Sequence, residues 1–192
     1  MFPLPAARVH ARRVSTTRDV LKSLWSWKMN RAIFFDRDGT LNEEVGYLWQ
    51  VEKFKWIDGA REAIKFCNER GLLAVVVTNQ GGIAKNLYTS KEVDALHSFM
   101  QESLAEIDAH IDGFYYCPHH PDFSGECDCR KPKPGLILKA CEDLNIEPAQ
   151  SILIGDAERD TAAAQAAGLS AGILFTGGNL LEVVKHESEK YF

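Results

Sequence analysis

Short apolar runs alternate with longer amphipathic segments along most of the chain. We expect strands at residues 32–35, 72–77, 113–116, 151–154 and 171–175. We expect helices at residues 59–70, 90–107, 135–144 and 159–167, with Ser90 as the N-cap of the second. Because strands that alternate with helices build parallel sheets, the pattern predicts an α/β fold with one central parallel sheet covered by helices.

Two segments break this alternation. Residues 37–57 are polar and aromatic and too long for a simple loop, so we expect a small flap over the end of the first strand. Residues 117–134 show almost no periodicity, so something other than a hydrophobic core must order them. The chain has no room for a large inserted domain.

Composition and charge narrow the class of protein. The 192 residues, 45% of them hydrophobic, suit one domain with a core of its own. A formal net charge of -5 is unsuited to nucleic acid, and a small-molecule partner fits better. No apolar run approaches the roughly 18 residues that span a bilayer. We therefore expect a soluble, cytoplasmic monomer that binds neither nucleic acid nor membrane.

The first 28 residues differ from the rest. They contain six Lys and Arg residues and a single Asp. A basic, acid-poor leader resembles a transit peptide, but Met29 stands immediately before the first expected strand. A disordered tail or a start assigned too early therefore explains residues 1–28 better, and the expected domain spans residues 29–192.

The first expected strand ends at two carboxylates, Asp36 and Asp38, in the segment D-R-D-G-T. A carboxylate is ionised at neutral pH, so Asp36 can attack phosphorus without an activating base. Asp38 can then donate a proton to the leaving alcohol and later accept one from water. The pair can also share a divalent cation. The alternative to a catalytic pair is an Asp-Gly turn after the strand, in which Asp38 only hydrogen-bonds its own backbone.

Polar residues also end two later strands. Thr78 ends the second expected strand, and Asp156 follows the fourth. Because ligands of open parallel sheets bind at the carboxyl ends of the strands, these residues and Asp36 are expected to converge on one pocket.

A second cluster combines thiols and imidazole: Cys117, His119, Cys127 and Cys129. Three thiolates and an imidazole complete a tetrahedral zinc site, which can order a loop that lacks its own core. Disulfides are the alternative, and a reducing cytoplasm disfavours them. His120 can compete with His119 as the fourth ligand.

The D-x-D-G-T segment resembles the first motif of the haloacid dehalogenase superfamily, and similar later motifs follow in order. The resemblance implies a Rossmann-like three-layer sandwich and a Mg²⁺-dependent phosphatase that forms an aspartyl-phosphate on Asp36. It implies that Thr78, in T-N-Q-G-G, binds the transferring phosphoryl group and that Lys131 neutralises its charge. It also implies that Mg²⁺ is held by Asp36, Asp38 and Asp156, the last within a G-D-x-x-x-D segment.

A narrower resemblance rests on C-P-H-H-P and C-D-C-R-K-P-x-P-G. These segments are similar to the D-glycero-D-manno-heptose 1,7-bisphosphate 7-phosphatase family, which implies a heptose bisphosphate substrate and favours His119 as a ligand of structural zinc. The flap and the zinc loop would then select the substrate. The implied substrate-binding residues are Arg37, Glu44, Val45, Gly46, Tyr47, Asn79, Gln80, Gly81 and Arg130.

Two positions depart from that family's pattern. Ala157 stands where a lysine is common, and Lys85 where an arginine is common. Another sugar phosphate or histidinol phosphate is therefore an alternative substrate, and the anomer of the heptose stays open. A non-catalytic, zinc-stabilised binding module is the alternative to an enzyme. Such a module would be expected to lack the acidic pair or Lys131, and this sequence has both.

Overall fold

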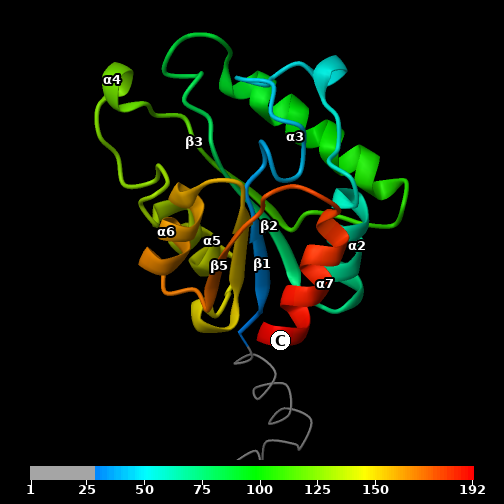
Figure 1. Ribbon diagram of the computed structural model, residues 1–192. Coiled ribbons are helices and arrows are strands. Elements are labelled where there is room, and N and C mark those ends of the chain that lie inside the picture. The colour runs from blue at the N-terminus through cyan, green and yellow to red at the C-terminus, as the bar shows by residue number, and fades with distance from the viewer. Residues whose placement is uncertain (1–28) are drawn as a thin grey trace, which may run out of the picture.

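The computed structural model of the protein describes residues 29–192 (Figure 1), so the basic leader expected at residues 1–28 lies outside the described part. The strands are β1 (Ala32–Phe35), β2 (Leu73–Asn79), β3 (Gly113–Cys117), β4 (Ile152–Gly155) and β5 (Ala171–Leu174). The helices are α2 (Ala60–Glu69), α3 (Ser90–Ala105), α4 (Pro121–Ser124), α5 (Gly135–Asp143), α6 (Glu158–Ala166) and α7 (Leu180–Tyr191). Two 3-10 helices, η1 (Val51–Lys53) and η2 (Pro148–Gln150), complete the described elements.

The five strands form one parallel sheet in the order β3-β2-β1-β4-β5. The chain moves outward from β1 through β2 to β3 and then returns to the opposite side of β1 to form β4. The strand order therefore reverses between β1 and β4, which is where ligands bind in open α/β sheets. The expected parallel sheet is confirmed.

Alternate residues of β1 belong to separate hydrophobic cores. Ile33 and Phe35 pack with side chains of α2, α3 and α7, whereas Ala32 and Phe34 pack with α5 and α6. All four side chains are fully buried. A strand covered on both faces reads as a continuous apolar run, which is the pattern of the sequence here. Helices cover both faces of the sheet (Figure 1), and the expected three-layer sandwich is confirmed.

The helix α7 was not expected from the sequence pattern. Its N-cap is Asn179, whose side-chain oxygen accepts from the Glu182 N–H at 3.3 Å. Leu180 and Val184 are fully buried in the core beside α2. These two residues are four positions apart and so lie on one face of the helix, which means that the sequence did carry a helical signal here.

The expected N-cap of α3 was wrong by one residue. Thr89 occupies that position, and Ser90 is the first helical residue. The Thr89 N–H donates to the carboxylate of Glu92 at 2.7 Å, which is half of a capping box. The sequence carried this signal, because Thr89 and Glu92 stand three residues apart.

Residues 37–57 form the small flap that we expected. Two isolated bridges, Asp38 with Asn42 and Asn42 with Trp56, fold this segment back on itself. Leu41 and Leu48 anchor it in the core beside α2 and α3. Residues 29–192 contain no large cap domain, and no helix within them is long and apolar enough to cross a membrane.

Candidate active site

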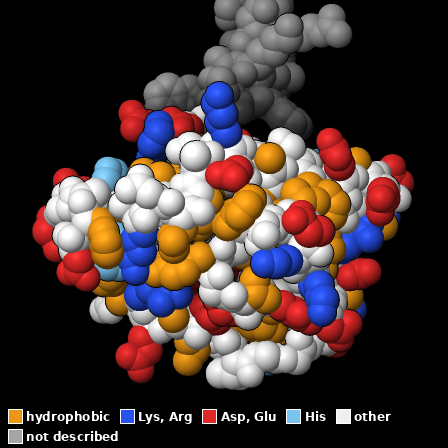
Figure 2. All heavy atoms as spheres, turned by 90° about the horizontal axis from the view of Figure 1, so that it is seen from above, with side chains coloured by type: hydrophobic (Ala, Val, Ile, Leu, Met, Phe, Trp, Pro, Cys, Tyr) orange, Lys and Arg blue, Asp and Glu red, His pale blue; other side chains and the backbone are white. Residues whose placement is uncertain are grey.

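The residues expected at the strand ends do come together. Asp36 directly follows β1, and Asp156 directly follows β4. Thr78 is the penultimate residue of β2. Since β1 pairs with both β2 and β4, the three carboxyl ends lie side by side. Figure 2 looks onto this end of the molecule, where Lys and Arg side chains gather on the side on which α4 lies.

Lys131 lies at the centre of a charged network that also contains Asp36 and Asp160. Its Nζ atom lies 3.0 Å from Oδ1 of Asp36 and 2.7 Å from Oδ1 of Asp160. It also donates to the carbonyl oxygen of Val77 at 2.7 Å. The ammonium group therefore lies between two carboxylates, with which it forms ion pairs, and one backbone carbonyl oxygen. The side chain is buried, which places an unscreened positive charge directly against Asp36.

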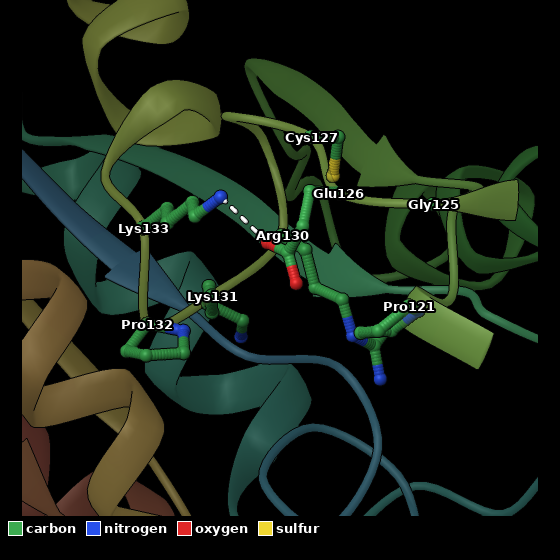
Figure 3. A pocket seen from close by; sticks show the side chains of 8 residues that line it. All are labelled: Pro121, Gly125, Glu126, Cys127, Arg130, Lys131, Pro132 and Lys133. Atoms are coloured by element: carbon green, nitrogen blue, oxygen red, sulfur yellow. Dashed lines mark hydrogen bonds and ion pairs between the residues drawn. The ribbon is translucent and has the colours of Figure 1, made fainter.

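Asn79 holds the backbone of Lys131 rather than presenting a free amide to the site. Its Nδ2 donates to the Lys131 carbonyl oxygen at 3.0 Å, and its Oδ1 accepts from the Lys131 N–H at 3.0 Å. This double contact ties the loop after β3 to the end of β2. Arg130 and Lys131 then direct their side chains apart, Arg130 toward Pro121 and Lys131 away from it (Figure 3).

Asp36 is only 3% exposed. Burial raises the pKa of its carboxyl group to about 6, and the nearby carboxylates of Asp160 and Asp38 act in the same direction. The positive charge of Lys131 opposes this rise. The lysine alone does not restore the ordinary pKa, and a further cation beside Asp36 would lower this pKa and favour the ionised form.

Three carboxylates offer a site for such a cation. One oxygen each of Asp36, Asp156 and Asp160 lie within 4.8 Å of one another. Oδ1 of Asp156 is buried without a hydrogen-bond partner, and the nearest cation, Arg159, is 3.8 Å away. Since buried carboxylate oxygens are normally satisfied, this oxygen fits a hard divalent cation such as Mg²⁺. Asp160 was not expected in this group from the sequence.

Gly39 makes room for Asp156. Its φ of +81° is a conformation that residues with a Cβ rarely adopt. A Cβ at this position would lie 2.1 Å from Oδ2 of Asp156. The Asp-Gly segment therefore lets the turn after β1 pass directly against the carboxylate that follows β4.

Asp38, which the resemblance implied as a Mg²⁺ ligand, is not part of the three-carboxylate group. Gln80 donates from Nε2 to Oδ2 of Asp38 at 2.9 Å and to Oγ1 of Thr78 at 3.0 Å. Gln80 is in turn fixed by the hydroxyl of Tyr88, which donates to Oε1 at 2.7 Å. Asp38 keeps 18% of its side chain exposed, so it can still reach a ligand in the cleft.

Arg37 was expected among the substrate-binding residues, but its side chain is fully buried. The guanidinium group lies under the flap against Asp38, at 2.9 Å. In this arrangement the side chain of Arg37 does not reach the surface of the cleft. Gln80 is likewise only 1% exposed.

The four expected zinc ligands form one cluster. Sγ of Cys117 lies 3.0 Å from that of Cys129 and 3.6 Å from that of Cys127, and Nδ1 of His119 lies 3.4 Å from Sγ of Cys129. Zinc–sulfur bonds of about 2.3 Å in a tetrahedron separate two sulfur atoms by roughly 3.8 Å, which is near the 3.6 Å and 3.5 Å of the two pairs that include Cys127 and longer than the 3.0 Å between Cys117 and Cys129. None of the five cysteines forms a disulfide. The donor set therefore fits zinc.

His120 is not part of that cluster. Its ring accepts a hydrogen bond from the Asp122 N–H at 3.3 Å, which caps the short helix α4. The structure therefore groups His119, which the resemblance favoured, and not His120 with the three thiols.

A pocket of about 300 Å³ borders the zinc cluster and the charged network (Figure 3). Arg130 reaches across it and donates to the carbonyl oxygen of His119 at 3.0 Å. A Cβ on Gly81 would lie 3.2 Å from the same guanidinium group, so the two predicted substrate-binding positions are neighbours. The lining residues are Pro121, Gly125, Glu126, Cys127, Arg130, Lys131, Pro132 and Lys133.

The exposed flap residues meet the zinc loop across Lys85. Its Nζ donates to the hydroxyl of Tyr47 at 2.5 Å and lies 5.3 Å from the ring centroid of Phe123. Glu44, Val45 and Gly46 are also exposed on the flap. The flap and the zinc loop are therefore connected through Lys85.

Comparison with known proteins identifies relatives of this chain. The haloacid dehalogenase-like hydrolase family model matches residues 41–168. The D-glycero-β-D-manno-heptose-1,7-bisphosphate 7-phosphatase of Haemophilus influenzae is 45% identical over 154 residues, 78% of this chain and 84% of the relative. The enzyme of the same name from Escherichia coli K12 is 44% identical over 152 residues, 77% and 80% of the two chains.

Solved structures agree with these matches. The D,D-heptose 1,7-bisphosphate phosphatase of B. bronchiseptica, complexed with magnesium and phosphate, superposes with a TM-score of 0.73 at 27% identity. The match covers 83% of this chain and 99% of that one. A Mesorhizobium loti protein described as a haloacid dehalogenase-like phosphatase gives a TM-score of 0.74 at 31% identity, over 78% and 74% of the two chains. The chain thus belongs to the haloacid dehalogenase-like hydrolases and, within them, to the family of the heptose bisphosphate phosphatases.

Proposed function

We propose that this protein hydrolyses the 7-phosphate of D-glycero-β-D-manno-heptose 1,7-bisphosphate, with Asp36 as the nucleophile. The main support for this proposal is the position of Asp36 at the end of β1. Its Oδ1 lies 3.0 Å from Nζ of Lys131, and it shares a three-carboxylate group with Asp156, whose Oδ1 has no hydrogen-bond partner. The relatives that bear this name support the choice of substrate. The cytoplasmic location and the monomeric state stay predictions.

In the proposed first step, a carboxylate oxygen of Asp36 bonds to phosphorus as the bond from phosphorus to the sugar oxygen breaks. Asp38 gives its proton to that departing oxygen. Lys131 and the hydroxyl of Thr78 offset the charge of the phosphoryl oxygens. In the second step a water oxygen bonds to phosphorus, the bond to Asp36 breaks, and Asp38 takes the proton of the water.

Mg²⁺ belongs to this proposal, with carboxylate oxygens of Asp36 and Asp156 as ligands and Asp38 contributing through its backbone carbonyl. When bound, the ion withdraws charge from the phosphate and keeps Asp36 ionised. Asp160 acts through Lys131, which it contacts at 2.7 Å. Zinc at Cys117, His119, Cys127 and Cys129 orders the loop that carries Arg130, which we propose binds the second phosphate of the substrate.

Phosphate release tests the proposal directly. The purified protein with Mg²⁺ is assayed on the β and α anomers of the heptose bisphosphate and on histidinol phosphate. We expect the highest kcat/KM with the β anomer and none with the Asp36→Asn variant. A preference for histidinol phosphate would replace the substrate, while turnover by Asp36→Asn would remove the nucleophile.

A further inference from the structure

The guanidinium group of Arg37 is fully buried beneath the flap. A buried charge is costly unless it is paired and hydrogen-bonded, and here both conditions hold. Nε and Nη2 donate to Oδ1 of Asp38 at 3.1 Å and 3.0 Å, and Nη2 also lies 2.9 Å from Oδ2. A further bond runs from Nη2 to the carbonyl oxygen of Leu48 at 3.0 Å. The planar fork therefore sets the orientation of the Asp38 carboxylate.

His97 of α3 contacts the other side of the same guanidinium group. Its Nε2 lies 3.4 Å from Nη1 of Arg37. Burial, together with the positive charge of Arg37, lowers the pKa of His97 to about 3. The ring is therefore neutral at physiological pH. Because arginine only donates, Nε2 must be the acceptor, and the proton of the imidazole is on Nδ1.

The His97 ring itself is held rigidly. It stacks on Phe114 with ring centroids 4.3 Å apart and an angle of 16° between the planes. The ring of Tyr116 lies across its edge at 5.8 Å. Both aromatic residues belong to β3, so the imidazole is clamped between α3 and the sheet.

Asp38 is thus supported from two directions. Arg37 and His97 act from beneath the flap, while Gln80 and Asn42 donate to the same carboxylate at 2.9 Å and 3.1 Å. A carboxylate held by several donors has one orientation, which a proton-transfer group requires. We propose that Arg37 and His97 are positioning residues that fix the Asp38 carboxylate for proton transfer to and from substrate.

This inference rests on the proposed function and predicts a dependence on the leaving group. Departure of a sugar alkoxide needs the proton of Asp38, whereas departure of 4-nitrophenolate does not, because that anion is a weak base. A displaced Asp38 therefore slows attack on a sugar phosphate and spares attack on an aryl phosphate. A substitution that only lowers the fraction of folded protein reduces the rates on the sugar phosphate and the aryl phosphate equally.

The test compares kcat/KM for the heptose bisphosphate and for 4-nitrophenyl phosphate, since kcat/KM reports the steps up to phosphorylation of Asp36. His97→Phe keeps the aromatic ring but removes the acceptor. We expect it to lower kcat/KM about tenfold for the sugar phosphate and less than about twofold for the aryl phosphate. His97→Gln restores an acceptor oxygen, and we expect it to recover most of the loss.

Two further variants keep the test decisive if His97→Phe folds poorly. Arg37→Lys retains the charge but loses the fork, and it should give the same leaving-group dependence as His97→Phe. Asp38→Asn should give the same pattern with a larger loss. Equal losses on both substrates in folded Arg37→Lys and His97→Phe would overturn the positioning role. If Asp36→Asn is active, the proposed function itself fails, which is a separate outcome.

Discussion

The ammonium group of Lys131 lies 2.7 Å from the carboxylate of Asp160, and both side chains are completely buried. Asp160 also accepts from the Ala157 N–H at 3.1 Å, at the start of α6. It therefore joins the helix after β4 to the lysine that faces Asp36. The G-D-x-x-x-D segment thus places Asp160 against the lysine and Asp156 in the group of three carboxylates.

Removal of this lysine should affect both stability and catalysis. Lys131→Met leaves Asp36 and Asp160 buried without their countercharge, so we expect the metal-free protein to lose about 3–5 kcal/mol of unfolding free energy. We expect kcat to fall by about 10²–10³-fold with Mg²⁺ present. Urea denaturation and phosphate release measure the two effects.

Lys133→Met is the matched control, because Lys133 pairs with Glu126 near the surface (Figure 3). We expect its urea midpoint to remain that of the parent protein. Equal destabilisation by the two substitutions would contradict a central role of Lys131.

Gly39→Ala should weaken metal binding. The added Cβ would displace Asp156, whose Oδ2 lies 2.1 Å from the position it would occupy. We expect Mg²⁺ affinity to fall at least about tenfold, as measured by calorimetric titration. Gly46→Ala provides the control, because Gly46 also has a positive φ, of +67°, but open space around it. Both variants share the backbone strain, so unchanged Mg²⁺ binding in Gly39→Ala would rule out the steric argument.

Zinc should be lost when one thiolate is removed. We expect the parent protein, purified without chelator, to contain one zinc ion per chain, and Cys127→Ser to contain far less. Cys127→Ser should also unfold at a lower temperature, because the loop of residues 117–129 lacks a core of its own. Cys141 belongs to α5 and is buried in the core, so Cys141→Ser should keep its zinc. Metal analysis of all three proteins checks this, and a parent protein without zinc would refute the site.

His97 should make the unfolding free energy depend on pH. Its pKa is about 3 in the folded protein and near the ordinary 6.5 in the unfolded chain. The unfolded chain therefore binds the extra proton between these values, and stability present above pH 6.5 is lost as the pH falls. Between pH 7 and pH 5 this group should cost about 2 kcal/mol.

His97→Gln removes the titration while keeping an acceptor for Arg37. Urea unfolding of both proteins at pH 7 and pH 5 isolates the contribution, since the other titrating groups are shared. The variant should lose less stability than the parent protein over this range. Parallel pH dependences would show that His97 is not held neutral.

The sequence by itself determined the five described strands, four of the six described α-helices and the identity of the chemical groups. The β1 run of four apolar residues and the thiol cluster are local features, so spacing alone predicts them. Helix α7 was missed although Leu180 and Val184 have helical spacing and pack on the core beside α2.

Only the tertiary structure decided what each polar side chain contacts. The sequence placed Arg37 and Asn79 in the substrate site, yet one lies buried against Asp38 and the other holds the backbone of Lys131. Asp160 gained a role for the same reason, since its partner is 29 residues away in the chain. Hydrogen bonds and ion pairs act over a few ångströms in space, and residue spacing along the chain does not encode those distances.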